Sequence, residues 1–266
     1  MEAHPGIYKG KVLDHALANG YFRMGNELFT TQEVPIGYEG RRRITDIAFW
    51  LRLNLSKAKE TKTTRRIRKK CAGFTYTIEP AYLTPEIELL YYEYYLTIPF
   101  DGYFTCRECI PEMNTEDSAF DTLMINIRNK GRLIGVGFFD IGKQALMSVL
   151  HFYHPDYKRF SIGKYIILLT KDFARSRQMD FVYPGYFLMG QSKMDYKLFP
   201  QKEAMELYLT DVQIWEPVEK FTKIELYNYY FKEILGVDLV QTDDVATYYK
   251  SQKEKLDEYG EPESLF

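Results

Sequence analysis

The stretch GRLIGVGFFDIGKQALMSVLHFYHPDYKRFSIGKYIILLTKDFARSRQMDFVYPGYF (131–187) decides the fold. RLIGVGFFDIG and ALMSVLHFYH are apolar runs joined by the short turn IGKQ, a pattern typical of a β-hairpin. From Ser161 onward, apolar residues recur at spacings of three and four, which predicts an amphipathic helix. The strand MDFVYPGYF follows, interrupted by Pro184 and Gly185, which would splay the sheet and open a groove beside the start of the helix. A hairpin followed by a helix and a strand predicts an α/β or α+β sheet flanked by helices.

Flanking segments supply further elements. Thr84 is a good N-cap for a helix in TPEIELLYYEYYLTIPF (84–100), with Pro85 at its first position. Helices are also predicted in KVLDHALANGYFRMG (11–25), NTEDSAFDTLMINIRNKG (114–131) and KIELYNYYFKEILG (223–236). Strands are predicted in GFTYTIEP (73–80) and, at a sheet edge, DVQIWEPV (211–218). The segment that follows residue 25, to about residue 56, shows no strong period.

The tyrosines of the helix at 84–100 allow two interpretations. Tyr91, Tyr92, Tyr94 and Tyr95 could stack on nucleic-acid bases. Their helical spacing favours core packing instead, because a tyrosine buries a large ring while its hydroxyl stays in water.

Composition indicates a folded protein with an uneven charge distribution. The 266 residues are 45% hydrophobic, with no run of about 18 apolar residues and no apolar leader, so we expect a cytoplasmic protein without a membrane span. The net charge is −2, yet KAKETKTTRRIRKK (57–70) carries eight Lys or Arg residues and one Glu. This run could contact phosphates or form a solvated surface. The closing QKEKLDEYGEPESLF is expected to be a partly ordered tail.

The loop HPDYKRFSIGK (154–164) is a candidate anion site. It leads into the start of the predicted helix with Lys158, Arg159, Ser161 and Lys164 within reach. Helix N-terminal amides and basic side chains would hold a phosphate or a 3′-terminal nucleotide, although an ordinary polar loop has the same composition. The pyrophosphate motif of acetyltransferases, R-x-x-G-x-G/A, is matched poorly by R-F-S-I-G-K-Y, which disfavours an acyl-CoA donor.

Other chemical motifs are weak. Cys106-x-x-Cys109 has metal-ligand spacing, but Cys71 is the only further cysteine and the histidines are scattered, so free thiols and no metal site are expected. No G-x-S-x-G, HExxH or Walker pattern occurs. Asp140 and Ser148 could face the same groove as the loop at 154–164. Asp140 could equally cap the hairpin turn, and Ser148 more readily bonds a backbone partner.

With these residues in view, the chain resembles the arginyl-tRNA and bacterial leucyl-tRNA protein transferases of the N-end rule across most of residues 10–210. LANGYFRMGNELF is similar to the family's G-F-R-R-S-G segment, and TKTTRRIRKK to its S-x-R-R region. GRLIGVGFFDIGKQALMSVLHFYHP resembles its paired strands ending in F-Y-D-P, and SIGKYIILL its S-L-G helix start. YPGYFLMGQSKMDYKLFP resembles its Y-L-G-Y followed by M-x-Y-K and a proline. His154 replaces the usual Asp, and Pro184 the usual Leu.

The resemblance implies a fold class. It is an α+β fold like that of the GCN5-related acetyltransferases, with a mixed sheet flanked by helices. We expect a small N-terminal domain with the basic segment (1–79), a transferase domain (80–240) and a polar C-terminal tail (241–266). The family's cysteine cluster has no counterpart between Phe22 and Arg65, so no metal and no cofactor are expected.

The resemblance also implies a reaction, the transfer of an amino acid from aminoacyl-tRNA to the α-amine of an acceptor protein that begins with Asp or Glu. An aminoacyl ester is already activated, and an α-amine of pKa ~8 is about one-tenth neutral at pH 7, so positioning should supply most of the rate. Three alternatives remain: an acetyl-CoA-dependent N-acetyltransferase, a non-catalytic module that binds N-termini or tRNA, and a domain whose tyrosines simply pack. The sequence sets no oligomeric state.

Site residues follow from the same resemblance. Arg65, Arg66, Arg159 and Lys164 are expected to hold tRNA phosphates. Lys197 would pair with an acidic first residue of the acceptor or with the developing oxyanion. The remaining candidates are expected to line the groove: Tyr183, Tyr186, Tyr196 and Asp140 as catalytic residues, and Tyr153, Ser161, Gly163, Gly185 and Met194 as substrate-binding residues.

Overall fold

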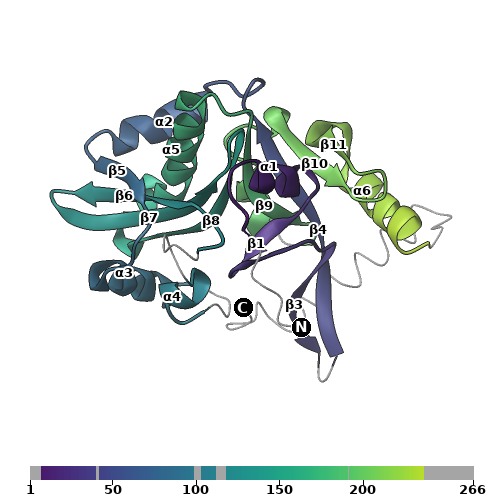
Figure 1. The fold of residues 1–266 in the computed structure, drawn as a ribbon, viewed down its shortest axis with the longest axis horizontal. Helices are drawn as coiled ribbons and strands as arrows, with labels where there is room; N and C mark the ends of the chain where they lie inside the picture. Colours follow the sequence, from purple (N-terminus) through teal and green to yellow (C-terminus); the bar gives the residue numbers. More distant parts are fainter. Residues whose placement is uncertain (1–6, 40–41, 99–102, 112–117, 191, 237–266) are drawn as a thin grey trace.

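The protein is a mixed sheet covered by helices on both faces (Figure 1). The computed structural model describes residues 7–39, 42–98, 103–111, 118–190 and 192–236. Its nine-stranded sheet has the order β11-β10-β4-β9-β8-β7-β6-β5, with β3 paired to β4, and β1 and β2 form a separate hairpin. The α+β class predicted from the sequence is confirmed.

The described elements have the following bounds. The strands are β1 (Phe22–Met24), β2 (Glu27–Phe29), β3 (Glu33–Glu39), β4 (Arg42–Asn54), β5 (Thr75–Pro80), β6 (Thr122–Asn129), β7 (Arg132–Ile141), β8 (Ala145–Tyr153), β9 (Phe181–Leu188), β10 (Met205–Leu209) and β11 (Ile214–Pro217). The α-helices are α1 (Lys11–Ala18), α2 (Lys62–Cys71), α3 (Pro85–Tyr95), α4 (Cys106–Cys109), α5 (Ile162–Ser176) and α6 (Lys223–Tyr229). The shorter helical turns include η1 (Pro155–Phe160), η2 (Ser192–Leu198), η3 (Lys202–Ala204), η4 (Val218–Lys220) and the π-helical η5 (Tyr230–Ile234).

The central hairpin, helix and strand match the prediction. β7 and β8 pair antiparallel, α5 begins at Ile162, and β9 returns parallel to β8. The parallel pairing joins only residues 145–147 to residues 181–183, and it ends directly before Pro184. Proline donates no backbone hydrogen bond, and Gly185 has φ +95°, which other residues adopt only with strain. β8 and β9 therefore diverge beyond Tyr183, as Pro184 and Gly185 predicted.

The helix predicted in 114–131 is wrong. Residues 122–129 form β6, a strand that pairs with β5 and β7, while residues 112–117 lie outside the described ranges. Lys130 and Gly131 have positive φ and close a tight turn into β7, so Gly131 ends a strand rather than a helix. β6 is covered on both faces, and a strand of that kind lacks the alternation that would reveal it.

β4 is a central strand that the sequence did not indicate. It pairs with β9 on one side and with β10 on the other, while its first part pairs with β3. Residues 47–51 are all buried, so a period of two is absent there too. β3, β4 and β5 lie within residues 33–80 and share the sheet with later strands. The division at residues 79 and 80 stays a prediction, and the predicted tail at 241–266 lies outside the described residues.

Helices of opposite faces pack on separate apolar clusters. α2 and α5 lie together on one face, where Ile67 of α2 and Ile166 of α5 pack in the largest cluster, and α3 and α4 cover the other face (Figure 1). α1 and the β1–β2 hairpin pack on a third cluster around Trp50. Within the described residues, no helix is long and apolar enough to cross a membrane.

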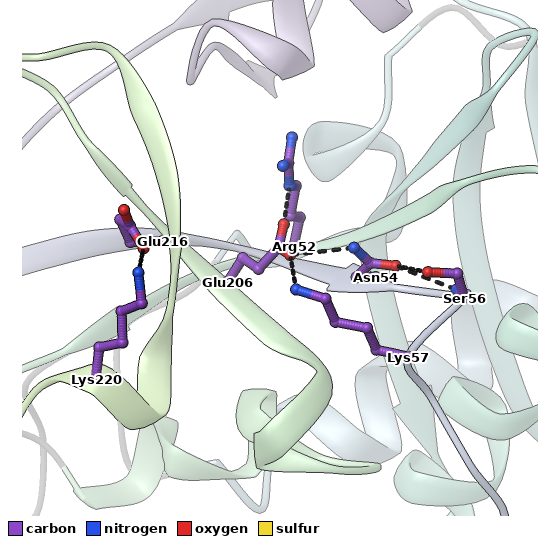
Figure 2. Close-up of polar contacts among 7 residues, drawn as sticks. All are labelled: Arg52, Asn54, Ser56, Lys57, Glu206, Glu216 and Lys220. Carbon is purple, nitrogen blue, oxygen red and sulfur yellow. Dashed lines mark hydrogen bonds and ion pairs between the residues drawn. The ribbon is translucent and has the colours of Figure 1, made fainter.

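A polar network around Glu206 joins β10 to β4. Arg52 Nε, Asn54 Nδ2 and Lys57 Nζ donate to its carboxylate at 2.7, 3.1 and 2.9 Å (Figure 2). These donors lower the pKa of Glu206 against the opposing effect of burial. The carboxylate is thus fully engaged, and the network anchors the sheet rather than forming an open site.

Candidate functional site

The divergence of β8 and β9 creates an opening occupied by side chains from several elements. η2 follows β9 and packs against it. The Nζ atom of Lys197 lies 4.4 Å from the centroid of the Tyr186 ring. A Cβ placed on Gly185 would lie 3.3 Å from that Nζ, so the glycine leaves room for the lysine. We call this region the β8–β9 opening and define it by Tyr94, His151, Tyr153, Gly185, Tyr186, Tyr196 and Lys197.

Lys197 has no ion-pair partner among the described residues. The surrounding protein lowers its pKa to about 8, because burial disfavours the ammonium form. Its side chain is only partly buried, so the charge remains within reach of a ligand. An unpaired ammonium over an aromatic face fits an anionic group that arrives from outside.

The β8–β9 opening also contains four tyrosines. Burial raises the pKa values of Tyr153, Tyr186 and Tyr196. The pKa of Tyr196 is raised further by the electrostatic effect of Tyr186, which disfavours the phenolate. Burial, then Tyr196 and Tyr153, raise the pKa of Tyr94 to about 12. These phenols therefore stay protonated and can donate hydrogen bonds. No described carboxylate contributes to any of these shifts, so the β8–β9 opening offers donors and a cation.

The start of α5 lies beside the β8–β9 opening. Ser161 caps the helix in a left-handed conformation, with φ 60°, and its side chain makes no capping hydrogen bond. A Cβ placed on Gly163 would contact the Tyr153 ring at 3.4 Å, so the helix start packs against the end of β8. Arg159 and Lys164 are exposed, with their cationic groups over the rings of Phe160 and Phe199. The helix starts at the carboxyl end of β8, as predicted.

α2 brings the basic run next to this loop. Thr61 and Thr64 form its N-terminal capping box, and Ile67 and Cys71 are buried. Lys70 Nζ donates to the Arg159 carbonyl at 3.1 Å, which ties the end of α2 to η1. On the outer face of α2, the side chains of Arg65 and Arg66 are exposed, and no ion pair is found for them in the described ranges.

Two predicted groove residues lie elsewhere. Asp140 is 0% exposed and accepts from Arg23 Nη1 at 2.8 Å and from Thr122 Oγ1 at 2.7 Å. Burial raises its pKa to about 6, although the Arg23 charge opposes this rise. Asp140 pairs with Met147 of β8. At about 3.3 Å per residue, Met147 lies ~20 Å along the strand from Tyr153, where β8 ends. The prediction that Asp140 faces the groove is wrong, because a buried ion pair holds it at the hairpin end.

Tyr183 is the second such residue. It is 1% exposed and lies in the apolar cluster beneath α1, with its ring against Phe22 and Trp215. Burial raises its pKa to about 12 despite the opposing charge of Arg52. Because it precedes Pro184, it still belongs to the part of β9 that pairs with β8. The prediction that Tyr183 lines the groove is therefore wrong, and the Met194 side chain lies outside the described part of the chain.

The cysteines behave as buried thiols. Cys109 Sγ lies 3.3 Å from the Tyr91 hydroxyl, and burial raises the pKa values of Cys106 and Cys109. In the described ranges, no group of three or more His, Cys, Asp or Glu side chains could hold a metal ion.

The sequence did not single out two members of the β8–β9 opening. His151 lies two residues before Tyr153 on β8, and the alternation of these two residues with Phe152 was the available signal. Tyr94 was assigned to core packing, and its half-buried ring does pack against Tyr153 at 5.6 Å between centroids. Only the approach of η2 shows that Tyr94 also neighbours Tyr196.

Known proteins resemble this region. The model of the family described as "Arginine-tRNA-protein transferase, C terminus" matches residues 86–205. Residues 86–205 are therefore similar to the C-terminal part of the arginine-tRNA-protein transferases. The resemblance predicted from the sequence is thus confirmed.

Curated relatives of the transferase family extend the match. An aspartate/glutamate leucyltransferase of Paracoccus denitrificans is 29% identical over 181 residues, which cover 63% of this chain and 63% of the relative. Another, from Pseudomonas putida, is 33% identical over 135 residues. These residues cover 50% of this chain and 57% of the relative. The chain thus spans less than two thirds of the length of either relative. Among solved structures, the match to L-PGS from Bacillus licheniformis covers 67% of this chain and 50% of that protein's chain, with 10% identity and a TM-score of 0.36.

Proposed function

We propose that this protein is an aminoacyl-tRNA protein transferase, which moves an amino acid from charged tRNA to the α-amine of an acceptor protein. The carrying observation is that every residue of the β8–β9 opening falls within the matched range 86–205. The match therefore covers the elements that hold the unpaired Lys197 and its tyrosines.

The acceptor side of the proposal concerns charge. Lys197 and the hydroxyls of Tyr94, Tyr186 and Tyr196 offer donors to an anion, and no described carboxylate competes for them. An acidic first residue of the acceptor supplies such an anion, with Lys197 as its counter-ion. The names of the curated relatives, which specify aspartate and glutamate, support this choice.

The donor side of the proposal concerns phosphate. Arg65 and Arg66 on α2, with Arg159 and Lys164 at the start of α5, would neutralise the tRNA backbone. The uncapped start of α5, with Ser161 and Gly163, would face a phosphate or the terminal nucleotide. Leucine is the transferred residue that the relatives' names favour over arginine. A GCN5-related fold and a cytoplasmic location remain part of this proposal.

One experiment separates this function from its alternatives. The protein is incubated with a mixture of charged tRNAs and peptides beginning with Asp, Glu, Asn, Gln or Ala, and the peptide N-termini are read by mass spectrometry. Aminoacylated Asp or Glu peptides are expected. Acetylated peptides in a parallel reaction with acetyl-CoA would replace the proposal with an acetyltransferase, which the uncapped helix start could also serve. Peptide or tRNA binding without any product would indicate a binding module.

A further inference from the structure

His151 of β8 lies at the β8–β9 opening, beyond the last β8–β9 pair at Met147 and Tyr183. It pairs with Gly137 of β7. A Cβ placed on Gly137 would lie 3.2 Å from Cδ2 and 3.6 Å from Nε2 of His151, so this edge of the imidazole packs over the glycine. Nδ1 lies on the opposite edge of the ring, away from this contact, so it is the ring nitrogen that Gly137 leaves free.

The imidazole has no structural partner that explains it. Nε2 is buried without a hydrogen bond among the described residues, and no bond is found for Nδ1 there. A buried polar atom without a partner costs free energy, and an apolar side chain would fill this place better. Polar groups kept at such a cost are characteristic of functional sites.

One charged neighbour, Lys197, acts on the imidazole of His151. Burial and then the Lys197 charge lower the pKa of His151 to about 4, so the ring is neutral at pH 7. Of the charged groups described on β7, α5 and η2, Lys197 is the one that acts on it. A neutral imidazole beside an unpaired ammonium can accept a proton, but the positive neighbour weakens it as a base.

We propose that His151 is a catalytic residue of the transfer, a proton shuttle that becomes competent when an acidic acceptor side chain neutralises Lys197. This inference rests on the proposed function. It gives the specificity for Asp and Glu a catalytic consequence as well as a binding one, because the same carboxylate that seats the acceptor removes the repulsion on the imidazole.

The step balances as follows. The neutral α-amine attacks the ester carbonyl, and its nitrogen forms the new C–N bond while the carbonyl oxygen takes up negative charge. His151 Nδ1 accepts one proton from that nitrogen. As the carbonyl re-forms, the C–O bond to the tRNA breaks, and the imidazolium returns the proton to the departing ribose oxygen. The products are the extended peptide and uncharged tRNA, with His151 neutral again.

The kinetic test uses His151→Gln, with His15→Gln on the exposed face of α1 as the matched control. Single-turnover transfer from aminoacyl-tRNA to an Asp-starting peptide is measured against pH. A loss of about 100-fold or more in rate, with peptide affinity unchanged, is expected for H151Q and none for H15Q. His151→Leu should show the same loss with an undiminished melting temperature, because it removes the unpaired nitrogen. Transfer by H151Q or H151L within threefold of wild type would refute the shuttle while the proposed function stands.

A second measurement does not require transfer. NMR follows the imidazole titration of His151, assigned among the four histidines by comparison with H151Q. The Asp-starting peptide should raise the apparent pKa of His151, whereas the Asn-starting peptide should not, and Lys197→Met should abolish the difference. Equal titration with both peptides would refute the coupling. Absence of transfer by the wild-type protein from any charged tRNA would instead refute the proposed function.

Discussion

Replacing Lys197 by methionine tests the acceptor site directly. The substitution keeps the length of the side chain and removes the ammonium that lies over Tyr186. A hydrogen bond to a charged group contributes about 1.5–3 kcal/mol, which corresponds to about 10- to 150-fold in kcat/KM. We therefore expect K197M to lose this factor for Asp- and Glu-starting peptides and little for Asn- and Gln-starting peptides.

The pH profile sharpens this prediction. The pKa of Lys197 is lowered to about 8, so its charge is present below that pH and is lost as the pH rises through it. The α-amine of the acceptor changes in the opposite sense, because it becomes neutral as the pH rises through ~8. Wild-type kcat/KM for an Asp-starting peptide should thus peak near pH 8 and fall above it. Lys197→Arg, which stays charged, should lose the alkaline fall.

The assay is transfer of a labelled amino acid to each peptide from pH 6 to 10. Lys202→Met is the matched control, because Lys202 is an exposed lysine of the nearby turn η3. Equal losses for acidic and amide peptides in K197M would refute the role of Lys197 as counter-ion. A wild-type profile that keeps rising above pH 9 would refute the lowered pKa.

Three further predictions concern other parts of the molecule. The double variant Arg65→Ala and Arg66→Ala should bind tRNA more weakly. The slope of log K against log salt, measured by filter binding, should become shallower by about 0.7–0.9 for each phosphate that the variant no longer neutralises. An unchanged slope would show that α2 does not contact the tRNA. Asp140→Asn should destabilise the protein by about 3–5 kcal/mol in urea unfolding, because Arg23 keeps a buried charge without its counter-ion; unaltered stability would contradict that pairing. Gly185→Ala should lower both melting temperature and transfer, since φ +95° strains alanine and its Cβ would lie 3.3 Å from the Lys197 ammonium; wild-type transfer would show that the glycine is dispensable.

Much of the fold could be predicted where local chemistry governs it. The turn between β7 and β8, the start of α5 at Ile162 and the Thr84 cap of α3 all follow from residues close in sequence. The end of the β8–β9 pairing at Pro184 was equally visible, because a missing N–H and a positive φ act within the residues that carry them. The same stretch carried the resemblance that the family match later confirmed.

The site was predicted only in part, for a reason seen in Asp140. Its partner Arg23 is 117 residues away in sequence, so nothing beside Asp140 shows that its carboxylate is already neutralised. Tyr183 has the neighbours of a groove residue but lies on the paired side of the break, where Phe22 and Trp215 cover it. Tyr186 and Tyr196, beyond the break, do flank Lys197.

The sequence by itself determined the order of hairpin, helix and strand, the Pro184-Gly185 pair at which β8 and β9 diverge, and the resemblance of residues 86–205 to a transferase family. These features depend on backbone preferences and on patterns that are contiguous along the chain. Only the tertiary structure decided that β4 lies at the centre of the sheet and that Asp140 is buried. It alone brought His151 within the electrostatic range of Lys197, because that effect depends on distance in space rather than along the chain.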